Sequence, residues 1–389
     1  MLVLILLSAL PDAMLAVVLR DLFVDRYGVP AEAAQMFLAV NLLGAGLAIP
    51  LVRWLRRRCP AWSIAAAGAL ADAALLGLMW LPIGFVDTLA IRLLEGAADV
   101  ATFAALFQIL GEVGGRPAAW RMGVGATMLV GGLGGGAAIG GVMVRASSQG
   151  PTVAFVIGAA CCVLTAVAAW VGSGVLDRAA PRLERPEEPS RDPVRPLWPS
   201  LIMAASDRAT GAVLTAVFAG FLAKNLGYDA AERGFLVGLP LILMALGAAP
   251  AGWVADRLGA LRVRSACAVA YAICFSLVAW VGLSTAQLSV VLLVLGVAAA
   301  PLLPASLSLA SQAGRGTAGL AAFRTAGDAG YFLGIVTVVA VGAWAGGDLL
   351  TTQRGLMVGF GLLHLACTVA TAIAGQRGAC EGSGRISSE

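Results

Sequence analysis

Three ionisable residues lie within one apolar stretch of the sequence, from Leu89 to Leu110. They are Arg92, Glu95 and Asp99, and their spacing puts them on one face of a helix. Charges are costly in the apolar interior of a membrane, where they mark paths for ions, protons or polar compounds. An arginine stays protonated and can hold a neighbouring carboxylate ionised. We therefore predict a charged pathway inside a bundle of membrane helices, with a static ion pair that fixes helix packing as the alternative.

The composition of the whole chain agrees with a membrane location. Apolar residues make up 60% of the 389 residues and charged residues 12%, about half the charged share of a soluble domain. The net charge of +4 is modest and basic residues cluster in short loops, which argues against nucleic acid as a partner. The sequence has no Ser/His/Asp set, metal-ligand set or phosphate-binding loop. We predict no enzyme activity, no cofactor and no metal, and energy drawn from an ion gradient.

Apolar segments long enough to cross a bilayer predict twelve helices. Their expected ranges are 2–19, 35–52, 62–82, 84–109, 122–144, 152–175, 199–222, 233–254, 264–282, 286–309, 318–341 and 355–374. Residues 1–175 are expected to form one six-helix bundle and residues 199–375 a second. Residues 176–198, rich in proline and charge, form a linker, and residues 376–389 a tail. The first segment carries Asp12 and no basic leader, so we predict a membrane helix there rather than a signal peptide.

The distribution of charge and the internal repeat describe the same architecture. Most Lys and Arg residues lie in alternate loops on the side of the linker, so both termini and the linker are expected in the cytoplasm. The two halves resemble each other at four pairs of positions: Gly28 with Gly227, Pro50 with Pro250, Trp54 with Trp253, and Trp80 with Trp280. We therefore predict an all-α integral membrane protein of two pseudo-symmetric six-helix bundles that flank a central pathway.

The eighth predicted helix is followed by Gly252-Trp253-Val254-Ala255-Asp256-Arg257-Leu258-Gly259. Its glycines allow a tight loop, and Asp256 has the side chain to cap a helix start and pair with an arginine. The segment resembles the loop signature G-x-x-x-D-R-x-G of the major facilitator superfamily, with an ordinary basic loop as the alternative. The resemblance implies a gating loop of Gly252, Asp256, Arg257 and Gly259. The matching segment from Pro50 to Arg58 keeps the basic residues but lacks the glycine and the aspartate.

Two further segments resemble signatures of the same family. Arg92-Leu93-Leu94-Glu95-Gly96 is similar to the R-x-x-Q-G pattern of the fourth helix, whose arginine the family links to proton movement. The fifth predicted helix resembles the antiporter signature G-x-x-x-G-P-x-x-G-G, with Ala137 in place of proline, through Gly132, Gly136, Gly140 and Gly141. Plain packing of small residues is the alternative for these glycines.

The resemblance also implies a cavity lined by the first, fourth, seventh and tenth helices. On this sequence the cavity residues are Asp12, Arg92, Glu95, Asp99, Asp207 and Arg208, with Pro301, Pro304 and Ser306 opposite. Asp207 and Arg208 are adjacent, so they point in different directions and cannot form a simple pair. Arg324 and Asp328 are expected to pair one turn apart, for structure or for function.

Three other ionisable residues stand alone in the sequence. Asp12 has no basic residue nearby in the chain and is a candidate protonatable carboxylate. Asp72 is expected to pair with a neighbouring helix. His364, the single histidine, is expected to have a peripheral packing role.

The sequence thus predicts a secondary transporter similar to bacterial drug/proton antiporters, one that exports a small organic or amphipathic compound. Protons are the expected coupling ion. A symporter or facilitator that imports a small organic anion is one alternative, with Arg92, Arg208 and Arg324 as counter-charges. A transport-inactive membrane receptor or scaffold is another. The expected partners are a small-molecule substrate, protons and the lipid bilayer, and the expected form is a monomer in the inner (plasma) membrane of a bacterium.

Overall fold

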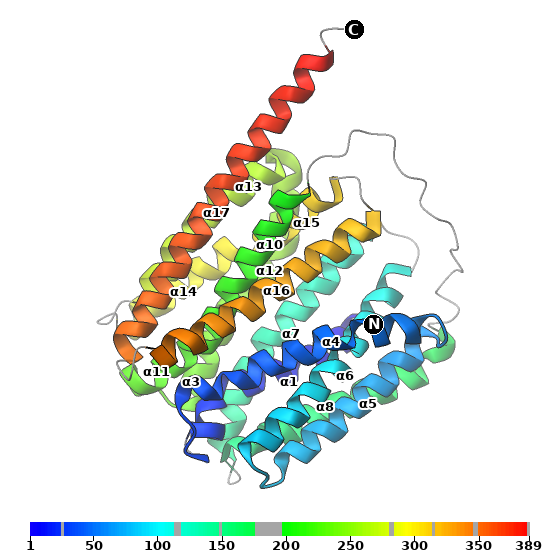
Figure 1. The fold of residues 1–389 in the computed structure, drawn as a ribbon, viewed down its shortest axis with the longest axis vertical. Helices are drawn as coiled ribbons and strands as arrows, with labels where there is room; N and C mark the ends of the chain where they lie inside the picture. Colours follow the sequence, from blue (N-terminus) through cyan, green and yellow to red (C-terminus); the bar gives the residue numbers. More distant parts are fainter. Residues whose placement is uncertain are drawn as a thin grey trace.

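Every regular element in the described part of the chain is a helix (Figure 1). The computed structural model describes residues 1–24, 27–112, 118–147, 150–175, 197–279, 284–312, 316–344 and 349–386. Within these residues, 11 helices are long and apolar enough to cross a membrane, and a shorter apolar helix, Leu2–Val17, precedes them. Large apolar side chains such as Leu246 and Leu47 are exposed, as they would be toward lipid tails. The protein is an all-helical membrane protein, as the sequence predicts.

The helices of the first half occupy the positions that apolar length predicts. They are α1 (Leu2–Val17) with the π-helical turn η1 (Arg20–Val24), α3 (Ala31–Ala34), α4 (Met36–Arg56), α5 (Ala61–Trp80), α6 (Phe85–Glu112), α7 (Ala118–Ala146), the short turn η2 (Gly150–Thr152) and α8 (Val153–Val171). The observed ends differ by a few residues from the predicted ends, because helices extend past the apolar core into polar flanking residues.

The second half repeats this plan, with one broken span. It contains α10 (Trp198–Val213), which runs through the π-helical segment η3 (Leu214–Phe218) into α11 (Ala219–Leu226), then α12 (Ala230–Leu258), α13 (Ala260–Val278), α14 (Thr285–Ala299), α15 (Leu302–Gln312), α16 (Gly316–Trp344) and α17 (Leu349–Ile386). The predicted helix 286–309 is divided into α14 and α15 beside Pro301, which has no N–H to continue the helix. The last helix extends beyond the predicted end at 374, into residues expected to form a tail.

The internal repeat that the sequence indicates has a structural counterpart. Gly28 and Gly227 both adopt the left-handed conformation, with φ of 65° and 69°, after the first helix of each half. A glycine reaches this conformation without the strain that a side chain would add. Each of these first helices also contains a π-helical segment, η1 in one half and η3 in the other. Trp280, one member of the fourth repeated pair, and most of the linker lie outside the described residues.

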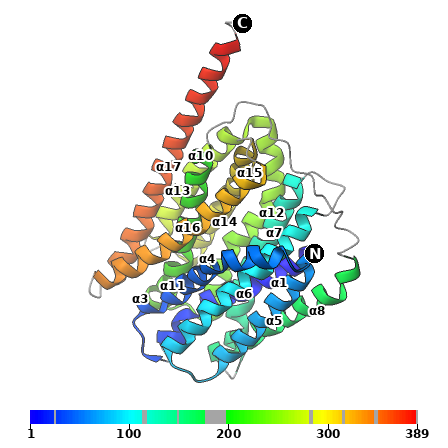
Figure 2. The same ribbon diagram turned by 45° about the vertical axis from the view of Figure 1, so that its right-hand side comes forward.

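The helices of the two bundles converge at one side of the molecule and diverge toward the other (Figures 1 and 2). We call the side that carries Met1, Val175 and Leu197 the linker side, and the side that carries Arg20 and Asp229 the far side. Consecutive helices alternate in direction, so α1, α7 and α16 end at the far side, and α12 begins there. The bundles are therefore joined most closely on the far side.

Small residues bring the two bundles together along α7 and α12. A Cβ atom on Gly141 would overlap the carbonyl oxygen of Ala230, and a Cβ on Gly134 would lie 2.9 Å from the backbone nitrogen of Ile242. Glycine on α7 thus lets two backbones approach more closely than larger residues allow. The contact runs from the far side toward the middle of the helices.

Candidate functional site

The centre of the first bundle is Arg92, which is only 1% exposed. Its Nη2 lies 2.9 Å from Oδ1 of Asp12 on α1, and its Nη1 pairs with the carboxylate of Glu95 one turn along α6. Asn41 of α4 donates a hydrogen bond of 2.7 Å to Glu95, and the Arg92 guanidinium lies 4.6 Å from the centre of the Phe37 ring. One cation is thus shared by two carboxylates in the membrane interior. We refer to Arg92, Asp12 and Glu95 as the Arg92 centre.

Close packing of α4 on α6 builds this centre. A Cβ on Gly96 would overlap the carbonyl oxygen of Asn41, and a Cβ on Gly44 would overlap that of Leu93. The two helices therefore touch backbone to backbone, which places the short Asn41 side chain within reach of Glu95. Gly96, which follows Glu95 in the sequence, is therefore needed for the close packing that builds the Arg92 centre.

The carboxylates of the Arg92 centre differ in their access to solvent. The side chain of Asp12 is 28% exposed, whereas the side chains of Glu95 and Arg92 are each 2% exposed. Asp99, two turns from Arg92 on α6, makes no ion pair with a described side chain. Asp12 is therefore the partly exposed carboxylate of the centre, and Glu95 is the enclosed one.

A second charged centre lies inside the other bundle, around Asp207 on α10. Its Oδ1 lies 2.8 Å from Nη2 of Arg264 on α13 and 2.8 Å from Nε2 of His364 on α17. Arg264 also donates a hydrogen bond of 2.7 Å from Nε to Oγ of Ser306 on α15. His364 packs against the Tyr271 ring, with centroids 5.0 Å apart. We refer to these residues as the Asp207 centre.

One sequence-based expectation is wrong at the Asp207 centre. His364 was expected to be peripheral, yet its side chain is fully buried and touches Asp207. Arg264, at the start of the predicted helix 264–282, is not among the predicted site residues, yet it is also fully buried. The reason is local: Gly259, with φ of 92°, turns the chain within one residue, so α13 begins at Ala260 and carries Arg264 inward.

Arg208 turns away from Asp207, as adjacent positions on a helix require. Its Nη2 lies 3.2 Å from Oδ1 of Asp328 on α16, and its guanidinium lies 5.5 Å from the centre of the Tyr331 ring. Arg324, one turn before Asp328 on α16, lies 3.0 Å from the other oxygen of that carboxylate. All three charged side chains are more than a third exposed. Two cations thus share one carboxylate at an open surface.

The structure therefore divides the six predicted cavity residues among three groups. Asp12, Arg92 and Glu95 meet in the first bundle, with Asp99 nearby on the same helix. Asp207 belongs to the Asp207 centre, and Arg208 to the pair with Asp328. Of the residues expected opposite, Ser306 contacts the Asp207 centre through Arg264.

The predicted gating loop is mostly helical. Gly252, Asp256 and Arg257 lie in the last turns of α12, and only Gly259 lies between helices. Asp256 is not a cap: the residue before α13 is Gly259, without a side-chain cap. Asp256 makes no ion pair with a described side chain, and Arg257 lies 3.8 Å from the centre of the Trp253 ring. The helix continues because no residue from Trp253 to Leu258 breaks it.

The glycines of the fifth helix, α7, face two different neighbours. Cβ atoms on Gly132, Gly136 and Gly140 would collide with Leu6, Leu10 and Met14 of α1. Gly141 instead meets Ala230 of α12 across the boundary between the bundles. This motif therefore packs α7 against both the first helix of its own bundle and the facing bundle.

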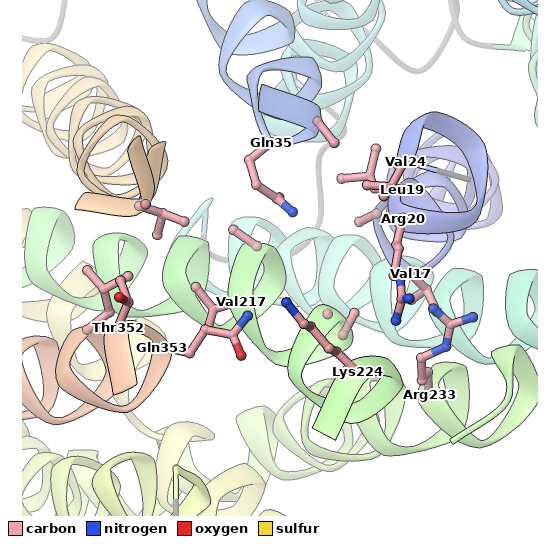
Figure 3. Close-up of a pocket in the computed structure, with 18 residues that line it drawn as sticks. Val17, Leu19, Arg20, Val24, Gln35, Val217, Lys224, Arg233, Thr352 and Gln353 are labelled. Atoms are coloured by element: carbon pink, nitrogen blue, oxygen red, sulfur yellow. The ribbon is translucent and has the colours of Figure 1, made fainter. Parts of the chain in front are cut away.

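A small cavity lies between the two bundles on the far side (Figure 3). Its volume is about 150 Å³, and its lining contains the cationic residues Arg20, Lys224 and Arg233 and the polar residues Gln35, Thr352 and Gln353. Two ion pairs join the bundles on the far side: Arg233, which lines the cavity, with Asp21 at 2.8 Å, and the exposed pair Arg145 with Asp229 at 3.1 Å. Among the described residues, no ion pair joins the bundles on the linker side.

Solved transporter structures share this fold. A bacterial homolog of the human lysosomal transporter Spinster, inward-facing and unoccupied, gives a TM-score of 0.72 at 14% identity over 96% of this chain and 95% of that chain. Its inward-facing occupied form gives 0.71 at 15% identity over 97% and 95%. A mutant of the peptide transporter POT in complex with sulfate gives 0.71 at 13% identity over 96% and 94%. No protein-family model matches the sequence, and comparison with curated proteins finds no significant match.

The fold and the buried charges define a class of membrane protein. The chain is a multi-pass membrane protein of two helical bundles, and those structures of like fold are transporters. Its fold is the one that the Spinster homolog and the peptide transporter POT share.

Proposed function

We propose that this protein is a proton-coupled secondary transporter that exports a small organic or amphipathic compound by alternating access. The observation that carries the proposal is the Arg92 centre, in which one permanently charged arginine contacts two carboxylates of unequal exposure. Protonation of either carboxylate removes one of the two ion pairs and releases part of the guanidinium. A proton taken up at Asp12 can therefore change how α1 is held against α6.

The arrangement of the bundles supports alternating access. The described ion pairs between bundles lie on the far side, where α7 and α12 also pack backbone to backbone. Rocking of one bundle against the other would break these contacts and open the far side. If the linker side is cytoplasmic, as the positive-inside bias predicts, the structure corresponds to an inward-facing state. A protease site inserted near Glu187 tests this orientation, because cleavage from outside intact cells would contradict it.

Flux measurements in proteoliposomes test the function. Vesicles that enclose a pH-sensitive dye would be given a panel of lipophilic cations and small organic anions, with and without an imposed pH gradient. An exporter gives proton movement opposite to that of the compound, and a symporter gives movement in the same direction. Absence of proton movement with every compound, despite compound flux, contradicts proton coupling. Absence of any flux favours a receptor or scaffold.

Import of a small organic anion is the second candidate. Arg208 and Arg324 share the single carboxylate of Asp328 at an exposed surface, which leaves one positive charge without a partner in that group. The far-side cavity also carries Arg20 and Lys224 (Figure 3). Both features would attract a carboxylate or a similar anion. Flux that disappears in Arg208→Gln for anions only would favour this candidate.

A further inference from the structure

Asp72 on α5 is a buried acid outside the Arg92 centre. It is 5% exposed, and its Oδ1 has no hydrogen-bond donor among the described residues. Its Oδ2 accepts a hydrogen bond of 3.3 Å from Sγ of Cys162 on α8. No described arginine or lysine forms an ion pair with it. A carboxylate enclosed in this way, with a weak thiol donor as its partner, would be strongly disfavoured in its charged form.

The packing of α5 on α6 brings Asp72 toward the Arg92 centre. A Cβ on Gly68, one turn before Asp72, would lie 2.5 Å from Oγ1 of Thr102 and 3.0 Å from the carbonyl oxygen of Ala98. The two helices run in opposite directions, so one turn forward on α5 corresponds to one turn back on α6. Asp72 accordingly lies beside Glu95, and the two carboxyl groups interact electrostatically.

A hydrogen bond between two carboxyl groups requires a proton on one of them. Ionised carboxylates only accept hydrogen bonds, whereas a carboxylic acid donates one. The charged groups that interact electrostatically with Asp72 are Asp12 from α1 and Arg92, Glu95 and Asp99 from α6, and the Cys162 thiol from α8 also contacts it. Arg92 is thus surrounded by four acids, namely Asp12, Asp72, Glu95 and Asp99. It already contacts Asp12 and Glu95.

We propose that Asp72 is a resident proton site that shares one proton with Glu95. Oδ1 of Asp72 carries the proton and donates it to the Glu95 carboxylate, which also contacts Arg92 and Asn41. On transfer, the O–H bond of Asp72 breaks and an O–H bond of Glu95 forms. Asp72 is then the carboxylate, with Cys162 still donating to it, and the total charge is unchanged. This inference rests on the proposed proton coupling and extends the pathway from Asp12 and Glu95 to α5.

Infrared spectroscopy of the purified protein in lipid tests the proposal without knowledge of the substrate. At neutral pH the wild type should show a carboxylic acid C=O stretching band, which Asp72→Asn removes. Cys162→Ala should shift the same band, because the thiol hydrogen-bonds to this carboxyl group. Asp87→Asn, at an exposed acid in the first turn of α6, is the matched control and should leave the band unchanged. A band that survives Asp72→Asn unaltered would overturn the proposal.

Two further measurements keep the outcome decisive. If Asp72→Asn does not fold, the Cys162→Ala variant tests the proposal alone, because it keeps the Asp72 carboxyl group and removes only the thiol that donates to it. If the C=O band does not shift in Cys162→Ala, the proton is not on Asp72. Failure of the proposed function can be told apart from failure of this inference. If the wild type moves no protons in proteoliposomes but shows the Asp72 band, proton coupling is contradicted and the proton site at Asp72 is still supported.

Discussion

Arg233 of α12 donates two hydrogen bonds from Nη2 to the Asp21 carboxylate, at 3.0 and 2.8 Å, across the boundary between the two bundles. The Arg233 side chain is 4% exposed. A charge-assisted contact that is this well shielded from water is stronger than a surface ion pair. It closes the far side beside the cavity of Figure 3.

Arg233→Ala should therefore shift the protein toward a state that is open on the far side. We expect several-fold faster labelling of a cysteine placed at Val217, a buried cavity residue, by an impermeant maleimide in a background without native cysteines. The matched control is Arg145→Ala, because the Arg145 side chain is 65% exposed in its ion pair with Asp229 and surface pairs contribute about 0–1 kcal/mol. Equal labelling rates in the two variants would contradict a gate at Arg233.

The close backbone contact between α7 and α12 predicts that a larger residue at this contact also shifts the protein toward a state open on the far side. Gly141→Ala would place a methyl group against the carbonyl oxygen of Ala230, so the far side should open and the cysteine at Val217 should again react faster. Gly135→Ala is the control on the same helix, because its Cβ would meet Leu10 of α1 at 3.6 Å, an ordinary contact distance. If both variants label at the wild-type rate, the α7–α12 contact does not hold the bundles together.

The Asp207 centre predicts a graded loss of stability. His364→Gln keeps an amide that can donate to Asp207, so its melting temperature in detergent should stay near that of the wild type. His364→Leu leaves Asp207 with Arg264 alone and should lower stability by about 1–3 kcal/mol, the cost of a lost buried hydrogen bond. Arg264→Leu removes the cation and should cost about 3–5 kcal/mol, as for other broken buried pairs. The reverse order of melting temperatures would show that His364 serves only to fill space.

The two charged centres differ in how far the sequence reveals them. Arg92 and Glu95 are one turn apart, and helical periodicity places them together. Asp12 joins them from another helix, so only the family resemblance indicates that contact. At the Asp207 centre, Asp207, Arg264 and His364 come from three helices, and no local spacing relates them. A single histidine inside an apolar helix was the available signal, because ionisable groups at that depth usually have a role.

The helix count and the spans follow from apolar length alone, whereas the helix junctions do not. A turn of one residue at Gly259 converts a predicted loop into helix and buries Arg264. The contact between α4 and α6 depends on pairs such as Gly96 and Asn41, which only the packed structure brings together. Local residue pattern therefore defines the elements, and backbone packing defines the charged centres.

The Arg92 centre gives the sharpest prediction about coupling. Arg92→Ala should be the most harmful change, because it leaves Glu95 and Asp12 facing each other without a cation, at a cost of about 3–5 kcal/mol. Arg92→Lys keeps the positive charge, but its ammonium group lacks the planar guanidinium with two Nη groups that contact the two carboxylates. It should retain more stability than Arg92→Ala and still transport poorly. Melting temperature in detergent and flux in proteoliposomes separate these effects.

Neutral replacement of the carboxylates should separate proton coupling from the movement of the bundles. Glu95→Gln keeps the hydrogen bond with Asn41 in reach while removing the charge that Arg92 holds, so the far-side gate and the fold should be preserved. Exchange of labelled for unlabelled substrate at equal pH needs the conformational change but no net proton transfer, so it should continue. Accumulation driven by a pH gradient should be lost in Glu95→Gln or in Asp12→Asn. Full accumulation in both variants would show that neither residue carries the coupled proton, and pH-independent flux in the wild type would then favour a facilitator.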